Sequence, residues 1–174
     1  MDWDAFEAAW HDSGCRALAS LAAAHPDETL YAAAFHLFYS DGTTVLSPAL
    51  AANTESAVHD RDGYSTRFVP PEWRWDVLAA ASDAMQPWYQ DMTDDVRHDA
   101  AIARVCKALT ATARQGRIHS SLPADFVVVI LDGQRGDGEA DLIRASVDPR
   151  LLAAVPGLAE HLREIDHSIG GDTR

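Results

Sequence analysis

Residues 28–55, ETLYAAAFHLFYSDGTTVLSPALAANTE, decide the fold of this chain. Residues 30–39 are apolar or aromatic in both alternating sets, which is typical of a central strand covered on both faces or of a strand with one thinly covered face. A turn signal follows at residues 40–43, where Gly42 can adopt a positive φ. Residues 44–46 are then expected to return as a second strand that Pro48 ends. The stretch therefore predicts a β-hairpin.

A helix is expected to start directly after the hairpin. Asn53 or Thr54 can cap it, because a short side-chain oxygen accepts a hydrogen bond from the free N–H groups of the first turn. Glu55 would lie in that turn, where the helix dipole favours a carboxylate. This helix would be short, covering residues 55–60.

Three longer helices are expected along the first two thirds of the chain. The first covers residues 3–24, with Asp2 or Asp4 as its cap and Pro26 after its end. The second opens at Pro71 or Glu72 and ends at Pro87, and the third runs from Thr93 or Asp94 to about Gln115. The buried face of the third helix would contain Val96, Ile102, Val105, Cys106, Leu109 and Ala113.

The last third of the chain contains the clearest strand, FVVVIL at residues 126–131. A polar loop at residues 133–141 and a return strand at 142–147 would complete a second hairpin. Helices are expected at residues 149–155 and 158–165. Two hairpins interleaved with helices predict a single α+β domain over residues 1–168, with an antiparallel sheet of about four to five strands packed against the helices. Residues 169–174 are expected to be a flexible tail.

The composition restricts the function. The chain has 27 acidic and 14 basic residues among 174, a formal net charge of −13. Such a charge argues against nucleic-acid binding, which depends on Lys and Arg neutralising phosphates. It suits a basic protein partner, and it equally suits a surface charge that only maintains solubility.

The sequence also predicts a location. Cys15 and Cys106 are isolated, which argues against a disulfide framework and favours a reducing cytoplasm. The acidic start MDWDAFEAAW is unlike a secretory signal. No run approaches the roughly 18 to 20 apolar residues that a membrane span needs. We therefore expect a cytoplasmic protein that does not cross a membrane.

Two sets of residues are candidates for function. Glu55 and Glu72 both begin predicted helices near the sheet, and paired carboxylates can perform acid–base catalysis if one pKa is raised. The alternative is that both serve the helix dipole. A recognition surface could form from aromatic residues favoured at binding hot spots, although core packing explains them equally well. These residues are Trp73, Trp75, Trp88 and Tyr89.

Metal and cofactor motifs are weak. His11 and Cys15 are spaced to share one helix face, but a zinc site would need further ligands. Cys106 lies on an apolar helix face without an evident base. The acidic Gly-rich loop at residues 132–141 fits neither a calcium loop nor a phosphate loop, and is expected to be solvated. The sequence thus predicts no metal site and no cofactor.

Residues 31–56 and the segment VPPEWRW at 69–75 are similar to an uncharacterised bacterial domain-of-unknown-function family. Its members combine an N-terminal helix, a YAFAFY-like strand, an NTEE-like helix start and a PPEW-like segment. Ser56 departs from the third position of NTEE. The resemblance covers nearly the whole chain and implies no established activity. The matching residues are Tyr31, Phe35, Asn53, Thr54, Glu55, Pro71, Glu72 and Trp73.

In general character the chain is also similar to immunity proteins of polymorphic toxin systems, which are compact and acidic. The leading hypothesis is therefore a non-enzymatic protein-binding domain that neutralises a basic toxin. The alternative is a small hydrolase that uses Glu55 and Glu72. A structural or regulatory module is a third reading, and the oligomeric state stays open.

Overall fold

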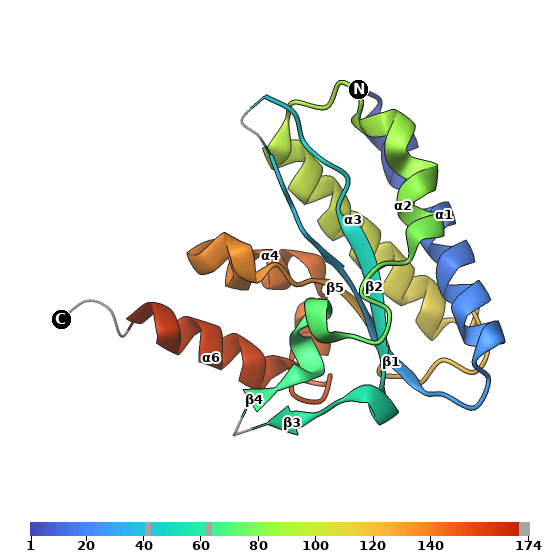
Figure 1. Cartoon of the computed structure of the whole chain (residues 1–174), viewed down its shortest axis with the longest axis vertical. Coiled ribbons are helices and arrows are strands. Elements are labelled where there is room, and N and C mark those ends of the chain that lie inside the picture. The colour runs from blue at the N-terminus through green and yellow to red at the C-terminus, as the bar shows by residue number, and fades with distance from the viewer. Residues whose placement is uncertain (41–42, 62–63, 171–174) are drawn as a thin grey trace.

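A computed structural model describes residues 1–40, 43–61 and 64–170 (Figure 1). The predicted turn residues at 41–42 therefore lie outside the described residues. Three strands form the main sheet, and six α-helices surround it. The strands are β1 (Leu30–His36), β2 (Ala49–Thr54) and β5 (Val127–Ile130), and the helices are α1 (Trp3–Ala24), α2 (Ala79–Met85), α3 (Asp95–Arg114), α4 (Glu139–Ser146), α5 (Pro149–Leu152) and α6 (Leu158–Gly170).

The sheet is mixed, with β1 at its centre in the order β2-β1-β5. Phe35 of β1 lies opposite Leu50 of antiparallel β2 and opposite Ile130 of parallel β5. A separate antiparallel pair joins β3 (Asp60–Arg61) to β4 (Tyr64–Ser65). The α+β class is therefore confirmed, whereas the prediction of an antiparallel sheet with about four to five strands is wrong.

The second strand lies later in the chain than predicted. Residues 44–46 form no strand, and Val45 makes only an isolated bridge to Ser40. Pro48 precedes β2 instead of ending a strand. The Ala-rich sequence of β2 has a low strand propensity, but all six residues are buried, and burial against both neighbours overrides propensity. Asn53 and Thr54 therefore end a strand, and the predicted helix start is only a 3₁₀ turn, Glu55–Ala57.

The predicted hairpin after β5 is absent from the described residues. A 3₁₀ helix over Gly133–Gly138 replaces the polar loop, and α4 occupies most of the predicted return strand. Ala140, Ile143 and Val147 recur at helical spacing and are all buried. With a helix here, β5 has no antiparallel partner and pairs instead with β1.

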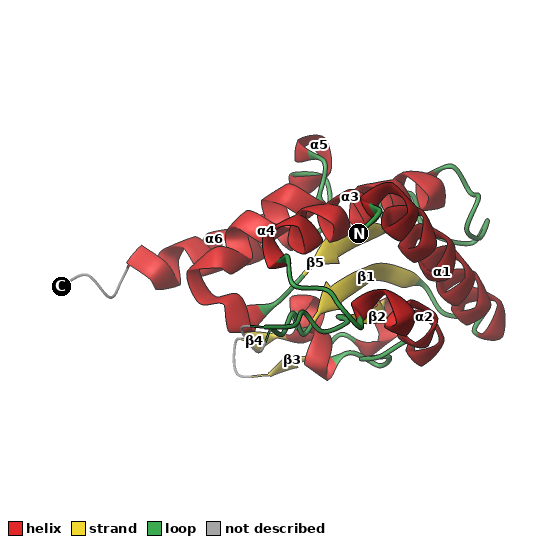
Figure 2. Ribbon diagram, turned by 90° about the horizontal axis from the view of Figure 1, so that it is seen from above, coloured by secondary structure: helices red, strands yellow, loops and turns green. Residues whose placement is uncertain are grey.

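The sheet is covered on both faces (Figure 2). One core joins the sheet to α1, α2 and α3, with Trp10 packed edge-on against Phe35 at 5.0 Å between ring centroids. A second core joins the other face to α4, α6 and the aromatic residues Phe68 and Trp73. The expected central strand covered on both sides is thus β1, whose seven residues are all buried.

Helices α1 and α3 follow the predicted caps. Asp2 accepts the backbone N–H of Ala5, and Asp94 accepts that of Arg97. The prediction that Val96 belongs to the buried face of α3 is wrong, because Val96 lies in the first turn and is 75% exposed. The apolar pattern of α3 therefore becomes a buried face only after this first turn.

Both outer edges of the sheet are occupied by hydrogen bonds. On the β2 side, Ala52 and Trp75 exchange two backbone bonds. On the β5 side, the Thr110 hydroxyl accepts the N–H of Val128 at 2.9 Å, and the Ser146 hydroxyl accepts the N–H of Ile130 at 3.0 Å. Side chains of α3 and α4 thus take the place of a neighbouring strand.

The C-terminal helix continues further than expected. Helix α6 reaches Gly170, two residues into the predicted tail, and residues 171–174 lie outside the described ranges. Figure 1 shows it extending away from α1 and α2. In the part of the chain that the structure describes, no helix has the length and hydropathy needed to cross a membrane.

Candidate functional site

The parallel strands β1 and β5 end side by side, and a hollow of about 240 Å³ lies at their carboxyl ends. Chains that leave neighbouring parallel strands in different directions often open a ligand crevice at this edge. We call this the edge hollow. Its wall comes from both strand ends, from residues 68–71 and from the first turns of α4 and α6. Its titratable residues are His36, Asp132, Glu139 and His161.

His36 presents an unused proton acceptor. Its side chain is 3% exposed, and Nε2 lies 2.8 Å from the carbonyl oxygen of Asp76. Because a carbonyl only accepts, Nε2 carries the hydrogen and Nδ1 of the neutral ring has a free lone pair. That Nδ1 is buried and has no partner among the described residues. Burial lowers the pKa of His36, which favours the neutral, basic form.

The pKa values of Asp132 and Glu139 are raised, in contrast to that of His36. Burial raises the pKa of both carboxyls, and the charge of Asp132 raises that of Glu139 further. Asp132 accepts the N–H of Phe38 at 3.3 Å. Glu139 forms no ion pair with a described residue. The hollow therefore contains two carboxyl groups whose pKa values are raised above the ordinary range.

His161 adds a second imidazole from α6. Its ring packs against Phe68 with centroids 5.4 Å apart, and its buried Nε2 has no partner in the described ranges. Burial lowers the pKa of His161. Buried polar atoms in folded proteins are nearly always hydrogen-bonded. Two unpartnered ring nitrogens on residues of one hollow therefore point to a hydrogen-bonding ligand or water.

The backbone at the edge hollow is unusual at Leu37, which lies in its wall. Leu37 has φ of 62° and is the one described non-glycine residue with a positive φ. This conformation is costly for a residue with a Cβ and persists only where surrounding structure enforces it. It turns the chain sharply at the end of β1, immediately after His36.

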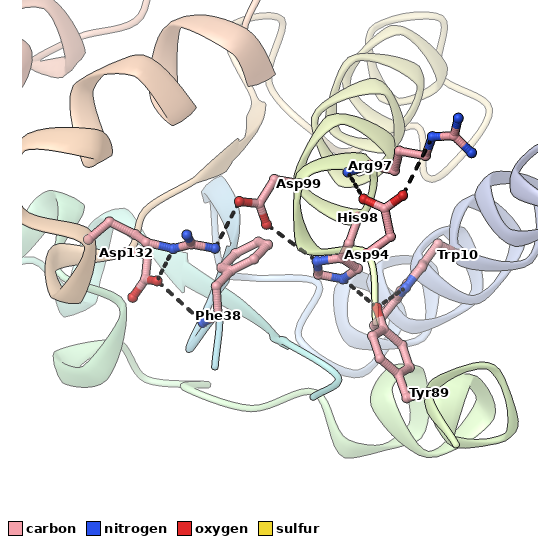
Figure 3. A network of polar contacts seen from close by, with 9 residues as sticks. Trp10, Phe38, Tyr89, Asp94, Arg97, His98, Asp99 and Asp132 are labelled. Carbon is pink, nitrogen blue, oxygen red and sulfur yellow. Dashed lines mark hydrogen bonds and ion pairs between the residues drawn. The ribbon is translucent and has the colours of Figure 1, made fainter. Parts of the chain in front are cut away.

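A network of polar contacts begins at Trp10 of α1 (Figure 3). The indole N–H of Trp10 donates to the Tyr89 hydroxyl at 3.0 Å, and that hydroxyl lies 2.8 Å from Nε2 of His98. Burial raises the pKa of Tyr89, so the phenol keeps its proton. Nδ1 of His98 then faces Asp99 at 3.4 Å.

The same network of polar contacts continues to the edge hollow through Arg135. Its guanidinium donates to Asp99 at 2.8 Å, and its Nε lies 3.7 Å from Asp132. Arg135 also lines a second hollow of about 210 Å³ with Phe38 and His98. This network of contacts from Trp10 to Asp132 therefore helps to hold the Asp132 carboxylate in place. Its members come from α1, α3, Tyr89 and the segment after β5.

The predicted catalytic pair is not assembled into a site. Glu55 forms a two-pronged ion pair with Arg67 at 2.7 and 2.8 Å, and this cation lowers the pKa of Glu55. The Arg67 guanidinium also lies 4.3 Å from the centre of the Tyr31 ring. Glu72 is exposed. Neither glutamate lines either hollow, so Glu55 has a structural partner and Glu72 projects from the surface.

The predicted aromatic surface is divided between the two cores. Trp73 is 4% exposed in the core shared with α4 and α6, where its indole N–H donates to the Thr66 carbonyl. Tyr89 is 5% exposed in the opposite core, and Trp75 and Trp88 pack partly buried against that core. The core-packing alternative therefore describes Trp73 and Tyr89, which present no surface to a partner.

The cysteines are also in structural surroundings. Cys15 contacts His11 at 3.7 Å on α1, as their spacing suggested, but the same ring nitrogen bonds the Thr112 hydroxyl at 2.9 Å. Burial raises the pKa of Cys15 and of fully buried Cys106, which disfavours the thiolate at both. Across residues 1–40, 43–61 and 64–170, no group of three or more His, Cys, Asp or Glu could hold a metal ion.

The comparisons with protein-family models, with curated proteins and with solved structures find no match. The resemblance to the domain-of-unknown-function family therefore stays a prediction. Its YAFAFY-like segment corresponds to β1, and its PPEW-like segment includes a 3₁₀ turn, Pro70–Glu72.

Sequence reasoning did not find the edge hollow, although two signals were present. His36 is the one polar residue in the apolar run at 30–39 apart from the tyrosine hydroxyls. Asp132 directly follows the strongest strand, where a carboxylate at a parallel edge often serves a site. Both signals acquire meaning only when β1 and β5 are known to be parallel neighbours.

Proposed function

We propose that the edge hollow binds a small polar molecule and exchanges protons with it, so that the chain acts as a small enzyme. The observation that carries this proposal is the unpartnered Nδ1 of His36 in the same hollow as Asp132 and Glu139. A neutral imidazole with a free nitrogen is a general base, and a carboxyl with a raised pKa is a general acid. His36 would thus act as the general base, and Asp132 or Glu139 as the general acid.

The lining also limits the reaction class. The described wall contains no Ser, Thr, Cys or Lys, so an activated hydroxyl, thiol or amine nucleophile is absent from it. The reaction favoured by these groups is proton abstraction or attack by a water molecule that His36 activates. This keeps the hydrolase class of the sequence hypothesis while moving the chemistry from Glu55 and Glu72 to His36, Asp132 and Glu139.

The hollow further limits the ligand. Its volume of about 240 Å³ lies below the usual range of drug-sized sites, which suits a ligand of few non-hydrogen atoms. The ligand needs an N–H or O–H group to satisfy Nδ1 of His36. Apolar walls from Phe68, Pro70 and Leu131 would cover the rest of it. Small primary and secondary amides, and lactones or esters that carry a hydroxyl group, have this chemistry.

The test is a ligand-observed NMR screen of small primary and secondary amides and of hydroxy-substituted lactones and esters, followed by turnover assays on the binders. We expect binding that His36→Gln abolishes and that His167→Gln, an exposed change on α6, leaves intact. Independently of any ligand, imidazole ¹⁵N shifts should report His36 with hydrogen on Nε2 at neutral pH. A screen without binders, or binding insensitive to His36→Gln, would remove the proposal.

A second candidate is the immunity-type binding protein, which the net charge of −13 favours. Exposed Asp91, Asp94 and Asp95 lie together before and within the first turn of α3, and Arg97 pairs with only one of them. A basic toxin would find complementary charge there, and its binding would weaken at high salt. Affinity purification from the native host at low and high salt is the test. A single stoichiometric basic partner lost at high salt would favour this candidate, whereas recovery of the protein alone would count against it.

A further inference from the structure

A larger hollow of about 530 Å³ lies beside β5, where its lining residues Thr110 and Ser146 bond to that strand. It is formed by one face of α3 and by the connection between α4 and α5. We call it the basic hollow, and it shares no lining residue with the edge hollow. Its size falls within the range of small-molecule sites.

Three cations line the basic hollow in a strongly acidic protein. They are Lys107, Arg114 and Arg150, and Lys107 is the chain's one lysine. No described carboxylate forms an ion pair with any of the three, whereas Arg67 and Arg104 each hold a glutamate. Three cations beside a single carboxylate, that of Asp148, create a local site for an anion, because screening confines the repulsion of distant charges to about 8 Å at physiological salt.

Three other polar side chains of the hollow already have partners. The Thr110 and Ser146 hydroxyls bond to β5, as described above. Asp148, the one acidic residue in the described lining, accepts the backbone N–H of Arg150 at 2.9 Å as the cap of α5. Arg114 donates one guanidinium N–H to the Ala124 carbonyl. The side chains of Lys107 and Arg150, the remaining N–H groups of Arg114 and the Gln115 amide are therefore the donors that the hollow offers a ligand.

Apolar side chains also line the hollow. They include Ala111 of α3 and Leu151 of the α4–α5 segment. Leu151 is only partly buried, so the hollow offers it uncovered apolar area. A fully hydrophilic anion such as inorganic phosphate would leave this area in contact with water, whereas an anion with an apolar body would cover it.

We infer that the basic hollow binds an organic anion whose apolar body lies between α3 and the α4–α5 segment while its charged group meets Lys107, Arg114 and Arg150. This site is independent of the acid–base chemistry proposed for the edge hollow. The recognised class is an amphiphilic carboxylate or phosphate.

The test uses 8-anilinonaphthalene-1-sulfonate, an aromatic sulfonate, as a fluorescent probe of the full chain. We expect saturable one-to-one binding that the double change Lys107→Gln with Arg150→Gln weakens at least tenfold. The control is Arg163→Gln, since Arg163 is an exposed cation of α6 that lies outside the hollow. Both variants should retain the wild-type Tm, because neither change removes an ion pair.

Further arms identify what is recognised. The uncharged analogue N-phenyl-1-naphthylamine should bind at least tenfold more weakly than the sulfonate, and His36→Gln should leave sulfonate binding unchanged. Decanoate and decyl phosphate compete for the bound sulfonate, and the stronger competitor identifies the preferred charged group. Equal affinity for the uncharged analogue, failure of both competitors, or full affinity in the Lys107/Arg150 variant would overturn the inference.

Discussion

Two glutamates of this chain, Glu55 and Glu139, occupy contrasting places. Glu55 follows β2 and accepts two hydrogen bonds from the Arg67 guanidinium, which lowers the pKa of Glu55. Glu139 begins α4, lies in the edge hollow without a cationic partner, and has its pKa raised by burial and by Asp132. The residue type and the position at a helical start are the same. What separates a structural carboxylate from a chemically available one is the cation beside it.

The largest effect on stability is expected from removing the partner of the structural carboxylate, Glu55. Arg67→Ala removes the ion pair with Glu55, the bond from Nε to the Pro156 carbonyl and the contact with Tyr31. We expect the free energy of unfolding to fall by about 2 kcal/mol, above the value of an ordinary surface pair because several contacts are lost together. Urea unfolding measures it. Arg67→Lys should recover only part of the loss, because lysine cannot reproduce the planar two-pronged contact, and a change within about 0.5 kcal/mol would contradict the assignment.

The next effect has the opposite sign and concerns the other glutamate. Glu139→Gln replaces an ionisable group whose pKa is raised by burial with a neutral group of the same shape. Because the pKa of Glu139 is raised in the folded state, Glu139 contributes fully to stability at pH values below its unfolded pKa of about 4.3. This contribution is lost as the pH rises through the folded pKa. The variant should therefore be more stable than wild type at pH 7, by about 1 kcal/mol, and similar near pH 4. Paired unfolding curves at the two pH values test this, and destabilisation at pH 7 would show that the carboxylate is held as an anion.

A smaller effect sharpens the assignment of His36 as a neutral base. Its folded pKa is lowered, so its contribution to stability is present above the unfolded value of about 6.5 and is lost as pH falls from there through the folded value. We expect stability to decrease on acidification below pH 6.5, and His36→Gln to make that decrease shallower. His161→Gln should act in the same direction, since burial lowers its pKa too. The pH dependence of unfolding, with His167→Gln as the exposed control, distinguishes these outcomes; an unchanged slope in both variants would contradict the assignment.

The smallest effect is expected at Glu72. Its side chain is exposed and lines neither hollow, so Glu72→Gln should change the free energy of unfolding by no more than about 0.5 kcal/mol. It should also leave ligand binding at the edge hollow intact. A loss of activity in this variant would restore the sequence-based pairing of Glu55 with Glu72.

Local patterns predicted the elements that such patterns determine. Helices α1 and α3 have continuous helical periodicity and side-chain caps, and β5 is a short β-branched run. Strand β2 was misplaced because its alanines carry little strand preference and it exists through burial between β1 and the segment at Trp75. Helix α4 was misassigned because eight residues are too few for periodicity alone to separate a helix from a strand.

The candidate site depends on contacts that local patterns do not contain. Asp132 was assigned to a solvated loop, and it is buried only because β5 lies parallel to β1 and brings Phe38 and Arg135 around it. His36 and His161 are 125 positions apart and meet through packing of α6 beside the strand ends. Glu55 and Glu72 were favoured because of expected helix starts, and both starts are single 3₁₀ turns.

The occupied edges of the sheet have a consequence for how this chain behaves in a crowded solution. An open strand edge is a template on which another chain can add a strand, leading to domain swapping or fibrous aggregation. Here the segment at Trp75 pairs with β2, while the Thr110 and Ser146 hydroxyls occupy N–H groups of β5. A three-stranded sheet is thereby protected against edge-to-edge growth by two hydroxyl groups and a short stretch of irregular backbone.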